Sequence, residues 1–153
     1  MASLFIGIDP GLTAGVALVK DGKVLYSTVL SIVKKEDVLA LQLEFGLHRQ
    51  DDIKVACEAT AWRASATKRC PKLHCGVLLG ILGLQGMPLV LVQPGTWRKE
   101  VLGNREGDKN DAIKYCKQIE GLGSISSHDE AEAVCIAIWA ASQPTSTFTT
   151  PKP

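Results

Sequence analysis

Residues 3–11 read SLFIGIDPG, an apolar run that ends abruptly in Asp9, Pro10 and Gly11. Such a run is typical of a buried strand, and Asp-Pro-Gly is a strong turn signal. We therefore predict a strand over residues 3–9 whose last residue places a carboxylate at the edge of a sheet.

Further strands follow this first one along the chain. Residues 15–20 and 23–31 flank Asp21-Gly22, a hairpin signal. Residues 53–58 form another apolar run that ends in a carboxylate, Glu58, and residues 89–92 form a short apolar run. These segments predict a sheet in which two strands end in acids.

The remaining periodic segments predict helices. Residues 36–48 place apolar side chains at Val38, Leu41, Leu43 and Phe45, as in an amphipathic helix. Ser127 and Glu130 have the spacing of a capping box at the start of the last helix, which we expect to end near residue 141. The other predicted helices cover residues 71–86, 94–102 and 108–119.

Residues 75–92 are almost wholly apolar, and a short membrane span is one interpretation of them. Gln85, Gly86 and Pro88 interrupt the run, so a buried helix followed by a turn and a strand is the favoured interpretation. We therefore expect no contact with a membrane.

The order of elements predicts an α/β fold, a mixed central sheet with helices on both faces. The 153 residues suit one domain, which we place at residues 1–142. Residues 143–153 are rich in Thr, Ser and Pro, and we predict a disordered tail there.

The charge balance is nearly even, with 17 Lys and Arg against 16 Asp and Glu and a net charge of +1. Binding to nucleic acid would therefore have to rest on local basic clusters. Five cysteines, an odd number, indicate reduced thiols, and the N-terminus has no basic-plus-apolar signal sequence. We expect a cytoplasmic protein.

Four carboxylates occupy informative positions: Asp9, Glu58, Asp129 and Glu132. Acids at the carboxyl ends of neighbouring parallel strands point into one crevice, and Asp129 and Glu132 project from one face of the last helix. Four converging carboxylates repel one another unless cations neutralise them. Oxygen ligands suit Mg²⁺ or Mn²⁺, and a pair of such ions serves phosphodiester cleavage.

Each acid also has a purely structural interpretation. Asp9 can begin a turn, Glu58 can lie at the rim of the sheet, and Asp129 can complement a helix dipole. Glu132 stands among apolar neighbours, so it requires a partner. His128 can take part in proton transfer, although a solvent-facing residue is the favoured interpretation.

Two basic groups are candidates for contact with DNA. Arg63, Lys68, Arg69 and Lys72 lie beside Trp62 in the loop after Glu58, a composition that suits phosphate binding and base stacking. The alternative interpretation of this segment is a solvated loop in which Trp62 folds onto the core. The second group is Arg98, Lys99, Arg105 and Lys109. Cys70, His74 and Cys75 lack the spacing of a usual zinc site.

The pattern as a whole resembles the RuvC-type Holliday-junction resolvases of the RNase H-like superfamily. The resemblance spans residues 3–141 and rests on residues 7–11 with Gly15, on Glu58, on residues 92–103 and on residues 128–133. It implies an RNase H-like fold, a homodimer, two Mg²⁺ ions per subunit with Mn²⁺ as a substitute, and cleavage of branched DNA, above all four-way junctions. The short chain looks like the bacteriophage members, which implies the cytoplasm of a bacterium or a phage-infected host.

Carried over residue by residue, the resemblance makes Asp9, Glu58, Asp129 and Glu132 the metal ligands. Glu132 departs from the family pattern, which usually has Asp there. Trp62 resembles an aromatic that wedges into the centre of the junction. In the predicted helix over residues 71–86, Gly76, Gly80 and Gly83 form a small-residue stripe that suits either a dimer interface or packing on the sheet.

Three rival functions remain open. An RNase H-like nuclease that acts on flaps or RNA would use the same four acids, since substrate choice depends on loops. A non-catalytic DNA-binding module would keep the fold without needing all of them. An actin-like ATPase shares the glycine-rich turn but needs two such domains, and this chain has room for one.

Overall fold

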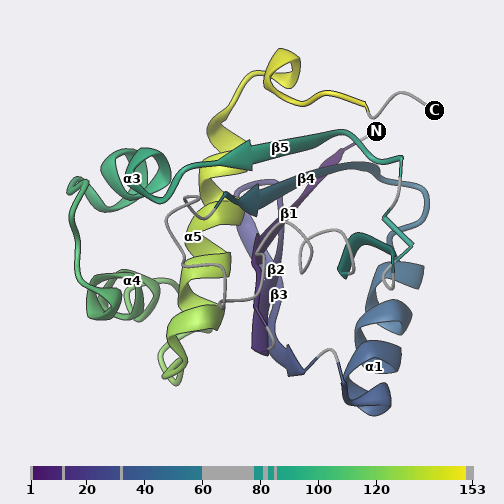
Figure 1. Cartoon of the computed structure of the whole chain (residues 1–153), viewed down its shortest axis with the longest axis horizontal. Coiled ribbons are helices and arrows are strands. Elements are labelled where there is room, and N and C mark those ends of the chain that lie inside the picture. Colours follow the sequence, from purple (N-terminus) through teal and green to yellow (C-terminus); the bar gives the residue numbers. More distant parts are fainter. Residues whose placement is uncertain are drawn as a thin grey trace, which may run out of the picture.

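A computed structural model of the chain describes residues 2–11, 13–31, 33–59, 78–80, 83–84 and 86–150. Five strands form one sheet in the order β3-β2-β1-β4-β5 (Figure 1). β1 is antiparallel to β2 and parallel to β4, so the sheet is mixed, as predicted. The strands are β1 (Ser3–Asp9), β2 (Thr13–Lys20), β3 (Lys23–Ser31), β4 (Asp52–Glu58) and β5 (Leu89–Val92).

Helical segments follow the positions predicted from the sequence. The segment after β5 is one continuous helical stretch that changes from α-helix to the wider π-helix at Arg98. The bounds are α1 (Lys35–Gly46), α3 (Pro94–Trp97), η1 (Arg98–Leu102), α4 (Lys109–Cys116), α5 (His128–Ser142) and η2 (Thr145–Thr147).

Alternation along the strands builds two separate cores, one on each face of the sheet. Leu4, Ile6 and Ile8 of β1 pack in the core that contains Leu41 of α1. Side chains of opposite parity, such as Phe5, pack with α4 and α5. Figure 1 shows α1 and α5 on opposite sides of the sheet, which confirms the prediction of helices on both faces.

Two glycines let α5 lie directly on the sheet. A Cβ atom at Gly7 would stand 2.2 Å from the Ala133 carbonyl oxygen, and one at Gly15 would stand 1.8 Å from the Asp129 carbonyl oxygen. No other residue fits at these distances, because real Cβ atoms essentially never come within 3.0 Å of another atom. The backbone of α5 is therefore held against β1 and β2 at both points.

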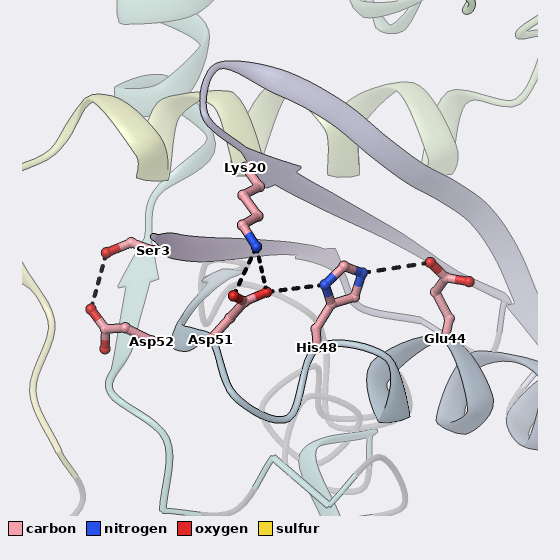
Figure 2. Close-up of polar contacts among 6 residues, drawn as sticks. All are labelled: Ser3, Lys20, Glu44, His48, Asp51 and Asp52. Carbon is pink, nitrogen blue, oxygen red and sulfur yellow. Dashed lines mark hydrogen bonds and ion pairs between the residues drawn. The ribbon is translucent and has the colours of Figure 1, made fainter. Parts of the chain in front are cut away.

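A polar network fixes the turn between α1 and β4. The Lys20 ammonium donates to both carboxylate oxygens of Asp51 at 2.8 and 2.9 Å, and the His48 ring bridges Asp51 and Glu44 (Figure 2). Ser3 donates to Asp52 beside it. Lys20 ends β2 and Ser3 begins β1, so this network secures the end of the sheet opposite to the carboxyl end of β1.

Two helix predictions need correction. Leu43 is 74% exposed, whereas Leu41 and Phe45 are buried, because a residue two positions away lies on the opposite side of a helix. The helix predicted over residues 71–86 ends before Gly83, which has a φ of 67°. The Gly83 N–H donates to the Gly80 carbonyl and the Leu84 N–H to the Leu79 carbonyl, which is a Schellman cap. Gly83 thus terminates this helix instead of extending a small-residue stripe.

Residues 143–150, where the sequence predicts a disordered tail, pack against the sheet in this structure. Thr149 exchanges backbone hydrogen bonds of 2.9 and 3.1 Å with Leu89 of β5. The Phe148 ring is buried, with its centroid 6.0 Å from that of Phe5. One aromatic anchor outweighs the polar composition of the surrounding residues.

Candidate active site

The first two acids meet because their strands run side by side. β1 and β4 are parallel, with Ile8 opposite Cys57, so Asp9 and Glu58 follow at the same level. Both strands end there, and each acid lies on the face covered by α5. This confirms that the two strand-ending carboxylates share one edge of the sheet.

The other two acids come from the first turns of α5. Gly15 is the β-sheet partner of Asp9 and touches the Asp129 carbonyl, so the close helix packing sets the start of α5 beside Asp9. Glu132 lies one turn further along α5 and is only 5% exposed. All three other carboxylates raise the pKa of Asp9 by charge repulsion, so the four groups converge.

Among the four acids, Asp9 has the most strongly raised pKa. Burial, followed by repulsion from Glu58, Glu132 and Asp129, raises its pKa to about 9. Contact with the Glu132 side chain adds to this rise. The raised pKa favours the protonated form of Asp9.

Glu58 is held by a buried indole. The Trp97 Nε1–H donates to Glu58 Oε2 at 2.8 Å, and Trp97 itself is fully buried. Burial raises the pKa of Glu58, and Trp97, Arg98 and Lys109 act against that rise. The indole therefore favours the ionised form of Glu58 and fixes its direction.

Glu132 has a cationic partner. The Arg98 Nη2 donates to Glu132 Oε1 at 2.7 Å, and the guanidinium carbon lies 5.2 Å from the centre of the Trp97 ring. Arg98 was expected to contact DNA, and the structure adds this contact to an acid of the cluster. Sequence reasoning omitted Trp97 from the site, although a buried Trp beside Arg98 needs a hydrogen-bond acceptor for its N–H.

The four carboxylates suit a divalent metal in chemistry and charge, because they supply only oxygen donors and carry an excess of negative charge that raises the pKa of Asp9. Within the described ranges, however, no three His, Cys, Asp or Glu side chains are already arranged as ligands around one ion. The contacts explain this arrangement, since Glu58 faces Trp97 and Glu132 faces Arg98 and Asp9. The donor set fits a metal, and Glu58 and Glu132 are turned towards protein partners.

Two details at the start of α5 differ from expectation. The Ser127 hydroxyl accepts from the Glu130 N–H, but the Glu130 carboxylate accepts from the Ser27 hydroxyl of β3 at 2.7 Å, so only half of the capping box forms. His128 is partly buried and does not simply face solvent. Its Nδ1 has no hydrogen-bond partner in the part of the chain that the structure describes.

Several predicted residues lie outside the described residues. These are Trp62, Arg63, Lys68, Arg69 and Lys72 of the basic loop, Gly76 of the small-residue stripe, and Cys70, His74 and Cys75. Lys109 is described: it is the exposed first residue of α4, and its charge lowers the pKa of Glu58. Among the described helices, none is long and apolar enough to cross a membrane.

Comparison with solved structures defines the class of fold as the α/β RNase H-like fold of RuvC. The structure of Thermus thermophilus RuvC is 23% identical, with a TM-score of 0.63, over 90% of this chain and 93% of that one. T. thermophilus RuvC in complex with Holliday junction substrate is also 23% identical, with a TM-score of 0.61 over 91% and 92% of the two chains. No protein-family model and no curated protein matches the sequence.

Proposed function

We propose that this protein is a metal-dependent endonuclease that cleaves branched DNA, with the four-way (Holliday) junction as its main substrate. The observation that carries the proposal is the convergence of Asp9, Glu58, Asp129 and Glu132 at one end of a RuvC-like sheet. A similar fold has been solved with a Holliday junction bound. Arg98 and Lys109 add positive charge beside the acids, where a phosphate backbone would approach.

In this mechanism Asp9, Glu58, Asp129 and Glu132 would hold two Mg²⁺ ions, or Mn²⁺ in their place. Bound there, the ions supply charge stabilisation for in-line displacement at a phosphodiester. Asp9 would serve as a ligand in its ionised form, which a nearby positive charge would favour against the burial and repulsion that raise its pKa. Trp97 keeps Glu58 in one orientation, and Lys109 attracts the phosphate backbone.

The partners in this proposal are branched DNA and a second copy of the chain, because paired cuts at a junction need two active sites. Trp62, Arg63, Lys68, Arg69, Lys72, Arg98 and Lys109 form the proposed DNA-binding set. We place the activity in the cytoplasm of a bacterium or of a phage-infected host, which the buried thiols of Cys116 and Cys135 support.

The test is cleavage of a labelled four-way junction in Mg²⁺, in Mn²⁺ and in EDTA, with a flap and an RNA–DNA hybrid as competing substrates. Asp9→Asn, Glu58→Gln, Asp129→Asn and Glu132→Gln should each reduce turnover by about 100-fold or more, since a lost ligand removes several kcal/mol of charge stabilisation. Junction binding in the same variants should change little. Glu130→Gln is the matched control, because Glu130 lies between two of the acids in sequence but bonds to Ser27.

Each contrary result points to another function. Preferred cleavage of the hybrid or the flap would make the protein an RNase H-like nuclease of different specificity. Junction binding without cleavage in either metal would make it a non-catalytic DNA-binding module. Full activity in Asp9→Asn would remove Asp9 from the mechanism.

A further inference from the structure

Arg98 occupies a position that conflicts with a role for Glu132 as a metal ligand. Its Nη2 donates to Glu132 Oε1 at 2.7 Å, and the Glu132 side chain is only 7% exposed. The Asp9 side chain also lies against Glu132. Glu132 therefore faces two protein groups, and a divalent cation would have to replace at least one of them.

The structure around Arg98 indicates that a cation would displace Arg98 from Glu132. Arg98 opens the π-helix η1 and stacks on Trp97, and its side chain is 21% exposed, so it has a path to solvent. Trp97 is fully buried and bonded to Glu58, which anchors the segment while the guanidinium moves. Single turns of π-helix are common at functional positions. An arginine displaced from Glu132 would still lie beside the acids, where it can pair with a phosphate through its planar donors.

We infer that Arg98 is the counter-ion of Glu132 in the metal-free protein and that binding of a divalent cation exchanges it, which releases the guanidinium for the DNA backbone. This inference rests on the proposed function, and it makes Arg98 a positioning residue in the metal-free state. The exchange links metal loading to DNA contact through one side chain.

The first experiment measures Mn²⁺ affinity by isothermal titration calorimetry without DNA, so activity plays no part. Arg98→Gln should bind Mn²⁺ about tenfold more tightly than the wild type, because the ion no longer competes with a charged hydrogen bond. Lys109→Gln is the matched control: it also removes one positive charge that acts on Glu58, but no bond to Glu132. It should tighten binding by about twofold or less, as expected of an exposed charge screened by solvent.

The second experiment is read on the wild type, and the Arg98→Gln variant serves only to assign the resonance. The Nη2–H resonance of Arg98, assigned through its loss in Arg98→Gln, should exchange slowly with solvent in EDTA, because this group donates to Glu132, and should shift when Mg²⁺ is added. An unchanged resonance at saturating Mg²⁺, or an Arg98→Gln protein that binds Mn²⁺ no more tightly than Lys109→Gln, overturns the exchange. Absence of any Mn²⁺ binding by the wild type would instead overturn the proposed function and the exchange with it.

Discussion

Replacement of Asp9 by Asn should stabilise the metal-free protein. The folded state raises the pKa of Asp9 from 3.8 to about 9, so at pH 7 the unfolded chain carries an ionised Asp9 and the folded chain a protonated one. Each pH unit above 3.8 adds about 1.4 kcal/mol to the cost of folding until the folded group also ionises. At pH 7 the accumulated cost is about 4 kcal/mol, a ceiling for what the neutral amide can restore.

The sign of the pH dependence follows from the raised pKa. Stability linked to Asp9 is fully present below pH 3.8 and falls as pH rises towards about 9. Asparagine cannot ionise, and its amide can still donate to Glu132. Asp9→Asn should therefore gain between about 1 kcal/mol, a usual value for removal of a functional strain, and the ceiling, with the larger gain at higher pH.

The assay is urea denaturation of both proteins in EDTA at several pH values between 5 and 9. Millimolar Mg²⁺ should then stabilise the wild type more than the mutant, since ligand binding to the folded state shifts unfolding by mass action. Two parallel stability curves, with the mutant no more stable than the wild type at pH 8 and equal responses to Mg²⁺, would refute the convergence of the four acids.

Other perturbations probe the supports of the site. Gly15→Ala should lower stability by about 1 to 3 kcal/mol and reduce cleavage, because its Cβ would overlap the Asp129 carbonyl; Gly123→Ala, which has open space, should melt like the wild type. Lys109→Gln should flatten the slope of log DNA affinity against log salt by about one unit, and a fluorescence anisotropy titration with an unchanged slope would place the DNA elsewhere. Trp97→Phe removes the donor that lowers the pKa of Glu58, so the acidic limb of the pH–activity profile should move to higher pH; an unmoved limb would leave Trp97 with a packing role alone.

The convergence of the acids was predictable because it follows from strand polarity and helix period. Asp9 and Glu58 end parallel neighbours, and Asp129 and Glu132 are one turn apart on a helix whose cap is visible in the sequence. Gly15 belongs to the same pattern, although its reason, the approach of the Asp129 carbonyl, needed the structure.

The partners of the acids were not predictable from the sequence. Trp97 reaches Glu58 and Arg98 reaches Glu132 because of the path taken by residues 93–98 after β5 and the side-chain rotamers chosen there. Neither depends on a periodic pattern. The segment after residue 142 was also not predictable from its composition. That composition favours disorder, whereas the Phe148 ring is buried.

The pairing of Thr149 with Leu89 also affects how this molecule can meet its neighbours. An edge strand presents unpaired N–H and C=O groups that can recruit a strand from another chain. β5 is the last strand of the sheet order, and the returning C-terminal segment supplies both backbone partners of Leu89 and a hydroxyl contact to the same carbonyl. The protein thus occupies the Leu89 end of this edge with its own chain, which disfavours strand addition by another copy at that end.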